Sequence, residues 1–278
     1  MGAFSFFTTA ELRGRGMTPR DLRAAIDVQQ FEPVIRGWFA TPQADRDAVA
    51  VLRAGARLGC VSALELHGAW CPPVDGPHVV LPSHASGRRL HSEGLPSGAV
   101  THWAPKKRVS GSSFAVAPIA LAVEQLLVCQ PPHLVVAVLD SLLHRRLVSR
   151  NRLEALLAHG PAVTRTLADH LEPKSEEGIE SIVRFGLASV GIRCRVQVVL
   201  RKGTRVDLLI DDWLILEIEG RETHALMETF TKDRVRAAHL MRDGRIVLQF
   251  AYASVVHDLD FVLDTVAEVI EQHAPVGR

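Results

Sequence analysis

The sequence predicts a protein of mixed α+β or α/β class with more than one domain. The chain has 278 residues, 47% of them hydrophobic, which is enough to build cores in two domains of ordinary size. Helical spacings of apolar residues alternate along it with short runs of Val, Ile and Leu that are typical of strands. Loops rich in Pro and Gly separate several of these patterns. We expect three parts, at residues 1–45, 46–165 and 166–278.

The first part, residues 1–45, is predicted to be a winged helix-turn-helix. Helical patterns occupy Thr9–Arg13 and Thr18–Ile26. The second has a strong start signal, because Thr18 suits the N-cap and Pro19 the first helical position. The turn between the patterns has the length of a helix-turn-helix connection. A strand-like stretch over residues 33–40 would then form the wing.

Arginines gather in this first part, where a winged helix meets DNA phosphates. They are Arg13, Arg15, Arg20, Arg23 and Arg36. We expect Arg20, Arg23 and Arg36 to contact DNA. The alternative is that these arginines form the solvated side of a small helical domain.

Residues 46–165 are predicted to form a mixed α/β scaffold. The expected elements are helices at Arg46–Ala56 and Val61–His67, strands at His78–Pro82 and Ala99–Trp103, and three helices between residues 118 and 159. Ser62 and Glu65 have the spacing of a capping box at the start of the second helix. The segment contains no nucleotide-binding glycine loop, so no nucleotide cofactor is expected.

The cysteines and the apolar runs predict a reduced, cytoplasmic protein with no membrane contact. Cys60, Cys71, Cys129 and Cys194 are scattered and form no CxxC pair, so the sequence gives no support for a structural zinc site. The start lacks the features of a signal peptide, and the longest apolar run, residues 114–129, is too short and too polar to span a bilayer. The net charge of +1 predicts no partner by itself.

The third part, residues 166–278, has the element order helix, three strands, helix, strand, helix. The predicted bounds are Glu176–Val190, Arg193–Leu200, Thr204–Ile210, Trp213–Glu219, Leu226–Arg242, Arg245–Tyr252 and Asp258–His273. Asp211 and Asp212 would form the turn of a β-hairpin between the second and third strands.

Three acids lie inside the strands of this hairpin, where a carboxylate is costly to bury without compensation. They are Asp207 on one strand and Glu217 and Glu219 on the other. Glu217 and Glu219 are two residues apart, so they are expected on the same face. A divalent cation is the simplest physical reason to gather the three carboxylates.

This order of elements and acids resembles the PD-(D/E)XK nuclease superfamily. Over Ser175–Ala251 it looks like the Vsr-like domain of bacterial proteins related to very-short-patch-repair endonucleases. The residues that carry the resemblance are Glu180, Arg184, Gln197, Val206, Asp207, Glu217, Ile218, Glu219, Gly220, His224, Phe230, Asp233, Arg234, Arg236, Leu240, Gly244, Val247 and Leu248. Residues 8–41, with Val61–His67, resemble more loosely the start of AbiEi-type antitoxin proteins of type IV toxin-antitoxin systems.

The resemblance implies that Asp207 and Glu217 bind Mg²⁺ (or Mn²⁺), with Glu180 reaching the same metal from the helix. The metal would activate a water for attack on a phosphodiester. Glu219 stands where the superfamily usually has Lys, and His224 would orient or shuttle a proton. The cations expected to clamp phosphate are Lys232, Arg234 and Arg236.

The departures from the pattern leave two hypotheses open. Gln249 stands where relatives usually have Arg, and Thr223 stands where they have the first of two histidines. The first hypothesis is a metal-dependent DNA endonuclease or nickase targeted by the winged helix, either as a monomer or as a homodimer. The second is an antitoxin-like transcriptional regulator with a catalytically silent nuclease fold, in which His224 is an ordinary loop residue and the cations only neutralise acids.

Overall fold

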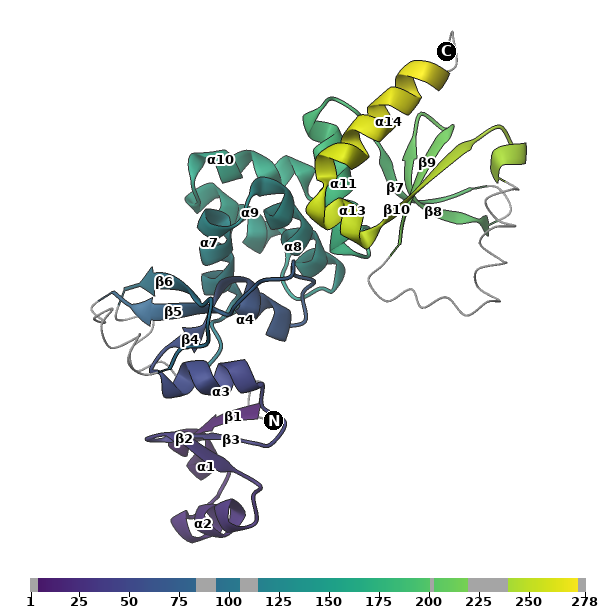
Figure 1. The fold of residues 1–278 in the computed structure, drawn as a ribbon. Helices are drawn as coiled ribbons and strands as arrows, with labels where there is room; N and C mark the ends of the chain where they lie inside the picture. Colours follow the sequence, from purple (N-terminus) through teal and green to yellow (C-terminus); the bar gives the residue numbers. More distant parts are fainter. Residues whose placement is uncertain (1–4, 84–93, 106–114, 201–202, 220–239, 275–278) are drawn as a thin grey trace. The chain divides into compact units, whose positions relative to one another are not determined.

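The computed structural model describes residues 5–83, 94–105, 115–200, 203–219 and 240–274. Within them the chain forms two compact units, Met1–Cys129 and Gln130–Arg278, which we call the N-terminal and C-terminal units. Figure 1 shows helices and small sheets in both, so the predicted mixed α+β class is confirmed. The finer division at residues 45 and 165 stays a prediction. Among the described helices, none is both long and apolar enough to cross a membrane.

The N-terminal unit begins with a helix pair followed by a hairpin. Its elements are β1 (Phe6–Thr8), α1 (Thr9–Gly14), α2 (Pro19–Asp27), β2 (Glu32–Ile35) and β3 (Trp38–Ala40), and the sheet order is β1-β3-β2. Helix α2 starts as predicted, since Thr18 Oγ1 accepts from the Asp21 amide at 3.2 Å while Asp21 Oδ2 accepts from the Thr18 amide at 2.9 Å. Phe7, Leu12 and Phe31 form the core beneath the helices.

A second small sheet, flanked by helices, completes this unit. Its elements are α3 (Arg46–Arg53), β4 (Arg57–Leu58), α4 (Cys60–Leu66), β5 (His78–Pro82), β6 (Val100–Ala104) and α7 (Ile119–Cys129). Strand β5 pairs antiparallel with β4 and parallel with β6. The predicted capping box at Ser62 is wrong, because α4 begins earlier, after Gly59 as N-cap. Ser62 Oγ instead accepts from the His78 amide at 2.9 Å and so holds the start of β5.

Helices open the C-terminal unit and are joined by one buried acid. The elements are α8 (Pro132–His144), α9 (Arg150–His159), α10 (Ala162–Arg165), the 3₁₀ helix η2 (Thr166–His170) and α11 (Gly178–Ser189). Asp140 of α8 is fully buried, and its Oδ2 accepts from Ser181 Oγ at 2.7 Å and Arg184 Nη2 at 2.8 Å. Its Oδ1 accepts from the Glu172 amide at 2.7 Å. These bonds tie α11 to α8.

A four-stranded sheet and two closing helices complete the unit. The elements are β7 (Arg195–Val199), β8 (Arg205–Ile210), β9 (Leu214–Glu219), β10 (Ile246–Ala251), α13 (Tyr252–His257) and α14 (Leu259–His273). The sheet order is β10-β9-β8-β7, with β10 parallel to β9 and the other pairs antiparallel. In Figure 1, α11, α13 and α14 lie together beside this sheet. Short α13 was not predicted.

The predicted hairpin turn at Asp211 and Asp212 is confirmed. Asp211 and Asp212 have φ values of 45° and 64°, and the Trp213 amide donates to the Ile210 carbonyl at 3.2 Å. Positive φ at both central residues is what a two-residue type I′ turn requires, and Asp tolerates it better than most residues. Of the predicted helix Leu226–Arg242, residues 240–242 are helical and the rest lies outside the described residues.

Candidate functional site

Two of the predicted carboxylates meet through a glutamine. Gln197 Nε2, on β7, donates to Glu180 Oε2 of α11 at 3.0 Å and to Asp207 Oδ1 of β8 at 3.4 Å. The resemblance had marked all three residues, but nothing in the sequence predicted this contact. One amide therefore holds two acids from different elements side by side.

A second contact joins Asp207 to the neighbouring strand. The paired residues of β8 and β9 run from Ile210 opposite Leu214 to Leu208 opposite Leu216. Just beyond them, Asp207 Oδ2 accepts from the Ile218 amide at 3.0 Å. The Asp207 side chain thus takes an amide of the strand that carries Glu217.

The two glutamates of β9 differ in their surroundings. Glu217 is 8% exposed, whereas Glu219, at the end of the strand, is exposed. Strand alternation predicts that both side chains point to one face, but only Glu217 is buried there. Of the pair, Glu217 is therefore the residue that a buried site can use.

Gln197 has a strained backbone. Its φ is +50°, although it lies within β7 between Val196, which pairs with Leu208, and Val198, which pairs with Val206. A left-handed conformation is uncommon for a residue other than Gly, and such strain is concentrated at functional sites. The strained residue is the one whose side chain bridges the two carboxylates.

Negative charge is crowded around this bridge. Burial, with a smaller contribution from nearby Asp207, raises the pKa of Glu180 to about 7 against the lowering effect of the Gln197 hydrogen bond. The pKa of Glu177 is also raised, first by burial and then by Asp207 and Glu176. A bound cation would offset both the cost of ionising these buried carboxylates and the repulsion between them.

The acids are gathered but not closed into a tight cage. Among the described residues, the carboxylates of Glu180, Asp207 and Glu217 do not form a group of ligand atoms close enough to hold a metal ion as they stand, whereas another cluster does. The amide of Gln197 lies between the first two. A metal bound by all three would have to displace this amide or share its place.

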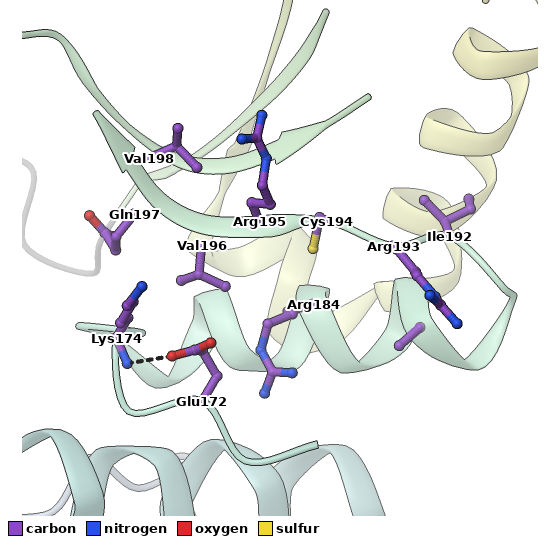
Figure 2. Close-up of a pocket in the computed structure, with 11 residues that line it drawn as sticks. Glu172, Lys174, Arg184, Ile192, Arg193, Cys194, Arg195, Val196, Gln197 and Val198 are labelled. Atoms are coloured by element: carbon purple, nitrogen blue, oxygen red, sulfur yellow. Dashed lines mark hydrogen bonds between the residues drawn. The ribbon is translucent and has the colours of Figure 1, made fainter. Parts of the chain in front are cut away.

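A basic cavity of about 480 Å³ begins at this bridge and runs between α11 and β7. Figure 2 shows Gln197 and Lys174 at one end and Arg193 at the other. Its charged lining residues are Glu172, Lys174, Arg184, Arg193 and Arg195. Arg184 is bound to Asp140 and donates to the His170 carbonyl at 2.6 Å, so it has a structural role. Arg195 forms an ion pair with Asp212, so Lys174 and Arg193 are the lining cations that an anionic ligand could use.

The remaining predicted site residues are either exposed arginines or lie outside the described residues. Arg20 and Arg23 are exposed on α2, and Arg36 is exposed in the turn between β2 and β3. Arg15 lies over the Phe7 ring, 4.9 Å from its centre. The predicted site residues His224, Lys232, Arg234 and Arg236 lie outside the described residues.

A second cluster, in the N-terminal unit, was missed by sequence reasoning. One ligand atom from each of Cys60, His78, His102 and Cys129 lies within 4.8 Å of all the others. His78 Nδ1 is 3.2 Å from His102 Nε2 and 3.5 Å from Cys129 Sγ. Sequence reasoning found no support for a metal site at the cysteines, yet this group of four residues, which we call the Cys/His cluster, could hold a metal ion.

Four separate elements bring these side chains together. His78 and His102 lie on adjacent parallel strands, and since His78 pairs with Val100 and Val80 with His102, both point to the same face. Cys60 is the first residue of α4 and Cys129 the last of α7. The only signal in the sequence was a histidine in each of two predicted strands.

Cys60 and His78 of the Cys/His cluster are buried, and His102 and Cys129 are half-buried. Burial raises the pKa of the Cys60 thiol, and Cys129 adds to the effect. Burial and the neighbouring His102 lower the pKa of His78 to about 4, and burial also lowers the pKa of His102. The imidazoles are therefore neutral near pH 7, the form in which they bind metals.

Comparisons with known proteins add no function. No family model matches the chain, and no curated protein matches it. A crystal structure of the RV2827C protein from Mycobacterium tuberculosis is 21% identical and covers 64% of this chain and 75% of its own length, with a TM-score of 0.30. A likeness at that score supports no argument about fold or function.

Proposed function

We propose that the chain is a metal-dependent DNA endonuclease or nickase whose active site is the acidic group around Asp207. The observation that carries the proposal is the bridge from Gln197 to both Glu180 and Asp207. It brings acids of α11 and β8 together next to the strand that carries Glu217. The order of α11 and the four strands, with β10 parallel to β9, agrees with the resemblance to PD-(D/E)XK nucleases.

The donor set fits Mg²⁺ or Mn²⁺, since hard cations prefer carboxylate oxygens. Asp207 and Glu217 would hold the ion, with Glu180 beside them. When bound, it would stabilise charge on a phosphodiester and lower the pKa of a water molecule.

Substrate binding in this proposal uses the basic cavity and the residues that the resemblance implies. The basic cavity next to Gln197 would accept a phosphate of the DNA backbone. Lys232, Arg234 and Arg236 would add phosphate contacts, and His224 would orient or shuttle a proton. Glu219 takes the place of the usual lysine, so its exposed carboxylate supplies no positive charge there.

A cleavage assay with matched variants tests the proposal. The full chain is incubated with supercoiled and mismatched DNA in Mg²⁺ or Mn²⁺, alongside Asp207→Asn, Glu217→Gln and the control Asp211→Asn. The control changes an exposed acid of the same hairpin to a residue that tolerates its positive φ. We expect the two site variants to lose roughly 10³-fold in rate, equivalent to several kcal/mol of metal-assisted catalysis, and the control to keep its rate.

The outcomes of this assay distinguish a wrong site assignment from a wrong function. Metal-dependent cutting that survives both site substitutions would mean that the active site is elsewhere. No cutting of any substrate by folded protein would favour the second candidate.

That second candidate is an antitoxin-like DNA-binding regulator with a silent nuclease fold. The observation that favours it is the exposure of Arg20 and Arg23 on α2 and of Arg36 in the following hairpin turn. A gel shift of the full chain on its own promoter tests it at several salt concentrations. Arg20→Ala and Arg36→Ala should each reduce the salt slope by about one, whereas Arg165→Ala, an exposed arginine of the other unit, should not.

A further inference from the structure

The Cys/His cluster has the spacing of a tetrahedral zinc site. For Zn–N and Zn–S bonds of ordinary length, tetrahedral geometry places two nitrogens about 3.3 Å apart and a nitrogen and a sulfur about 3.5 Å apart. The structure has 3.2 Å between His78 Nδ1 and His102 Nε2, and 3.5 Å between His78 Nδ1 and Cys129 Sγ. The remaining separations, which include those of Cys60 Sγ, are all within 4.8 Å.

The donor types select the metal. Two sulfurs and two imidazole nitrogens suit Zn²⁺, whereas Mg²⁺ and Ca²⁺ require oxygen ligands that this cluster lacks. Two thiolates also balance the charge of the ion, so the loaded site is neutral. A neutral group is the form that a buried position tolerates, and Cys60 and His78 are 0% and 3% exposed.

The backbone around Cys60 is built to present its sulfur. Cys60 has a φ of +45°, a strained value for a residue other than Gly. Its amide donates to the buried Gln125 Oε1 at 2.8 Å. A side chain on Gly59 would come within 2.6 Å of that same oxygen. The start of α4 is thus held in one conformation, with Cys60 facing the two strands and the end of α7.

We propose that Cys60, His78, His102 and Cys129 bind one Zn²⁺ ion that stabilises the N-terminal unit. Binding removes one proton from each thiol, forms two Zn–S and two Zn–N bonds, and releases the two protons to solvent. Four protein ligands leave no open position, so the site is structural rather than catalytic. The ion would join the starts of α4 and β5, the strand β6 and the end of α7 in a single crosslink. The proposal is independent of the nuclease function.

The first test is metal analysis of the full chain, expressed with zinc and purified without chelator. We expect one zinc ion per chain by elemental analysis, and a native mass that exceeds the apo mass by one zinc less two protons. Replacement by Co²⁺ should give the intense visible bands of a tetrahedral ion and the near-ultraviolet band of sulfur-to-cobalt charge transfer.

Variants locate the site. Cys129→Ser and His102→Asn should weaken zinc binding at least 10-fold in competition with a chromogenic chelator. The matched control is Cys71→Ser, because Cys71 is a partly buried thiol of the same unit whose Sγ donates to the Val61 carbonyl at 3.4 Å. It should keep one zinc ion per chain.

A measurement on the unmodified chain covers the case in which a variant does not fold. Zinc should protect Cys60 and Cys129 from alkylation until a chelator is added, and should leave the reactivity of Cys194 unchanged. Three results would overturn the proposal: folded chain with far less than one zinc and no cobalt bands, a Cys60–Cys129 disulfide in its place, or full zinc in both Cys129→Ser and His102→Asn.

Discussion

The Cys/His cluster and the acidic group around Asp207, for which we propose two different metals, are of opposite design. The first is a compact set of nitrogen and sulfur atoms, all within 4.8 Å of one another, from two buried and two half-buried residues. The second is acidic, more open and looser, with an amide between two of its carboxylates and a basic cavity beside it. A closed set of ligands stabilises a fold, whereas an open set of oxygens leaves room for water and substrate.

The comparison also shows why only one of the two could be suspected beforehand. Acids inside predicted strands stand out because burying them is costly. Histidines and cysteines are ordinary core residues, and nothing marks them until the fold brings them together.

The largest expected effect is that of a strong chelator on the two units. Removing a structural zinc should destabilise the N-terminal unit by about 5 kcal/mol or more, since zinc binding is part of its folding free energy. Hydrogen exchange followed by mass spectrometry separates the units. Peptides from α4, β5 and β6 should lose protection while those from α11 and β8 keep it. An equal loss of protection in both units, or no loss in either, would contradict a structural zinc site in the N-terminal unit.

Next in size is the effect of Asp140→Asn in the C-terminal unit. Asp140 is a buried acid paired with Arg184, so its loss leaves the Arg184 charge without this counterion. Burial raises the pKa of Asp140 to about 6, so the acid is ionised at pH 8. At that pH we expect a loss of about 3–5 kcal/mol in urea unfolding. The exposed Asp169→Asn is the control, and a loss no larger than that of the control would refute the structural role.

Glu180→Gln should do the reverse, because Glu180 is a buried acid that forms no ion pair with any of the described residues. Its folded-state pKa of about 7 lies above the ordinary 4.5, so its stabilising contribution is complete below about pH 4.5 and is lost as pH rises through 7. The shift corresponds to about 3 kcal/mol. In metal-free buffer Glu180→Gln should therefore be more stable than the unmodified chain at pH 8, but not at pH 4.5.

Metal binding sharpens this test. At pH 8, Mn²⁺ should stabilise the unmodified chain more than Glu180→Gln. Equal stabilisation of both proteins by Mn²⁺ would remove Glu180 from the metal site.

The smallest effect we predict is that of Gly59→Ala, next to the Cys/His cluster. The added carbon would lie 2.6 Å from Gln125 Oε1 and 3.3 Å from Val80 Cβ, so Gln125 must release the Cys60 amide. We expect a loss of about 1–3 kcal/mol. Gly14→Ala is the control, since no atom lies within 4 Å of its added carbon and its φ is not positive. In thermal unfolding with zinc bound, Gly59→Ala should therefore unfold at a lower temperature than Gly14→Ala.

Local signals in the sequence account for most of the elements. Thr18 and Pro19 fixed the start of α2, and Asp211 and Asp212 fixed the hairpin turn, because capping and positive φ depend on a few neighbouring residues. The start of α4 was misplaced because Gly59, which offers no side-chain cap, begins it rather than Ser62.

The candidate sites depend on contacts that a linear sequence does not contain. Asp207 was predicted from its place in a strand, but the left-handed conformation of Gln197, and with it the bridge to Glu180, arises from the pairing of β7 with β8. The Cys/His cluster requires the parallel pairing of β5 with β6 and two helix ends. No spacing motif encodes such a set.

Anomalous diffraction from one crystal form, measured on both sides of the zinc and manganese edges, tests most directly whether the two sites select different metals. Without added metal, we predict a zinc peak bound by Cys60, His78, His102 and Cys129. After a Mn²⁺ soak, we predict a manganese peak bound by Asp207 and Glu217. Manganese in the Cys/His cluster, or no ion beside Asp207, would contradict the account.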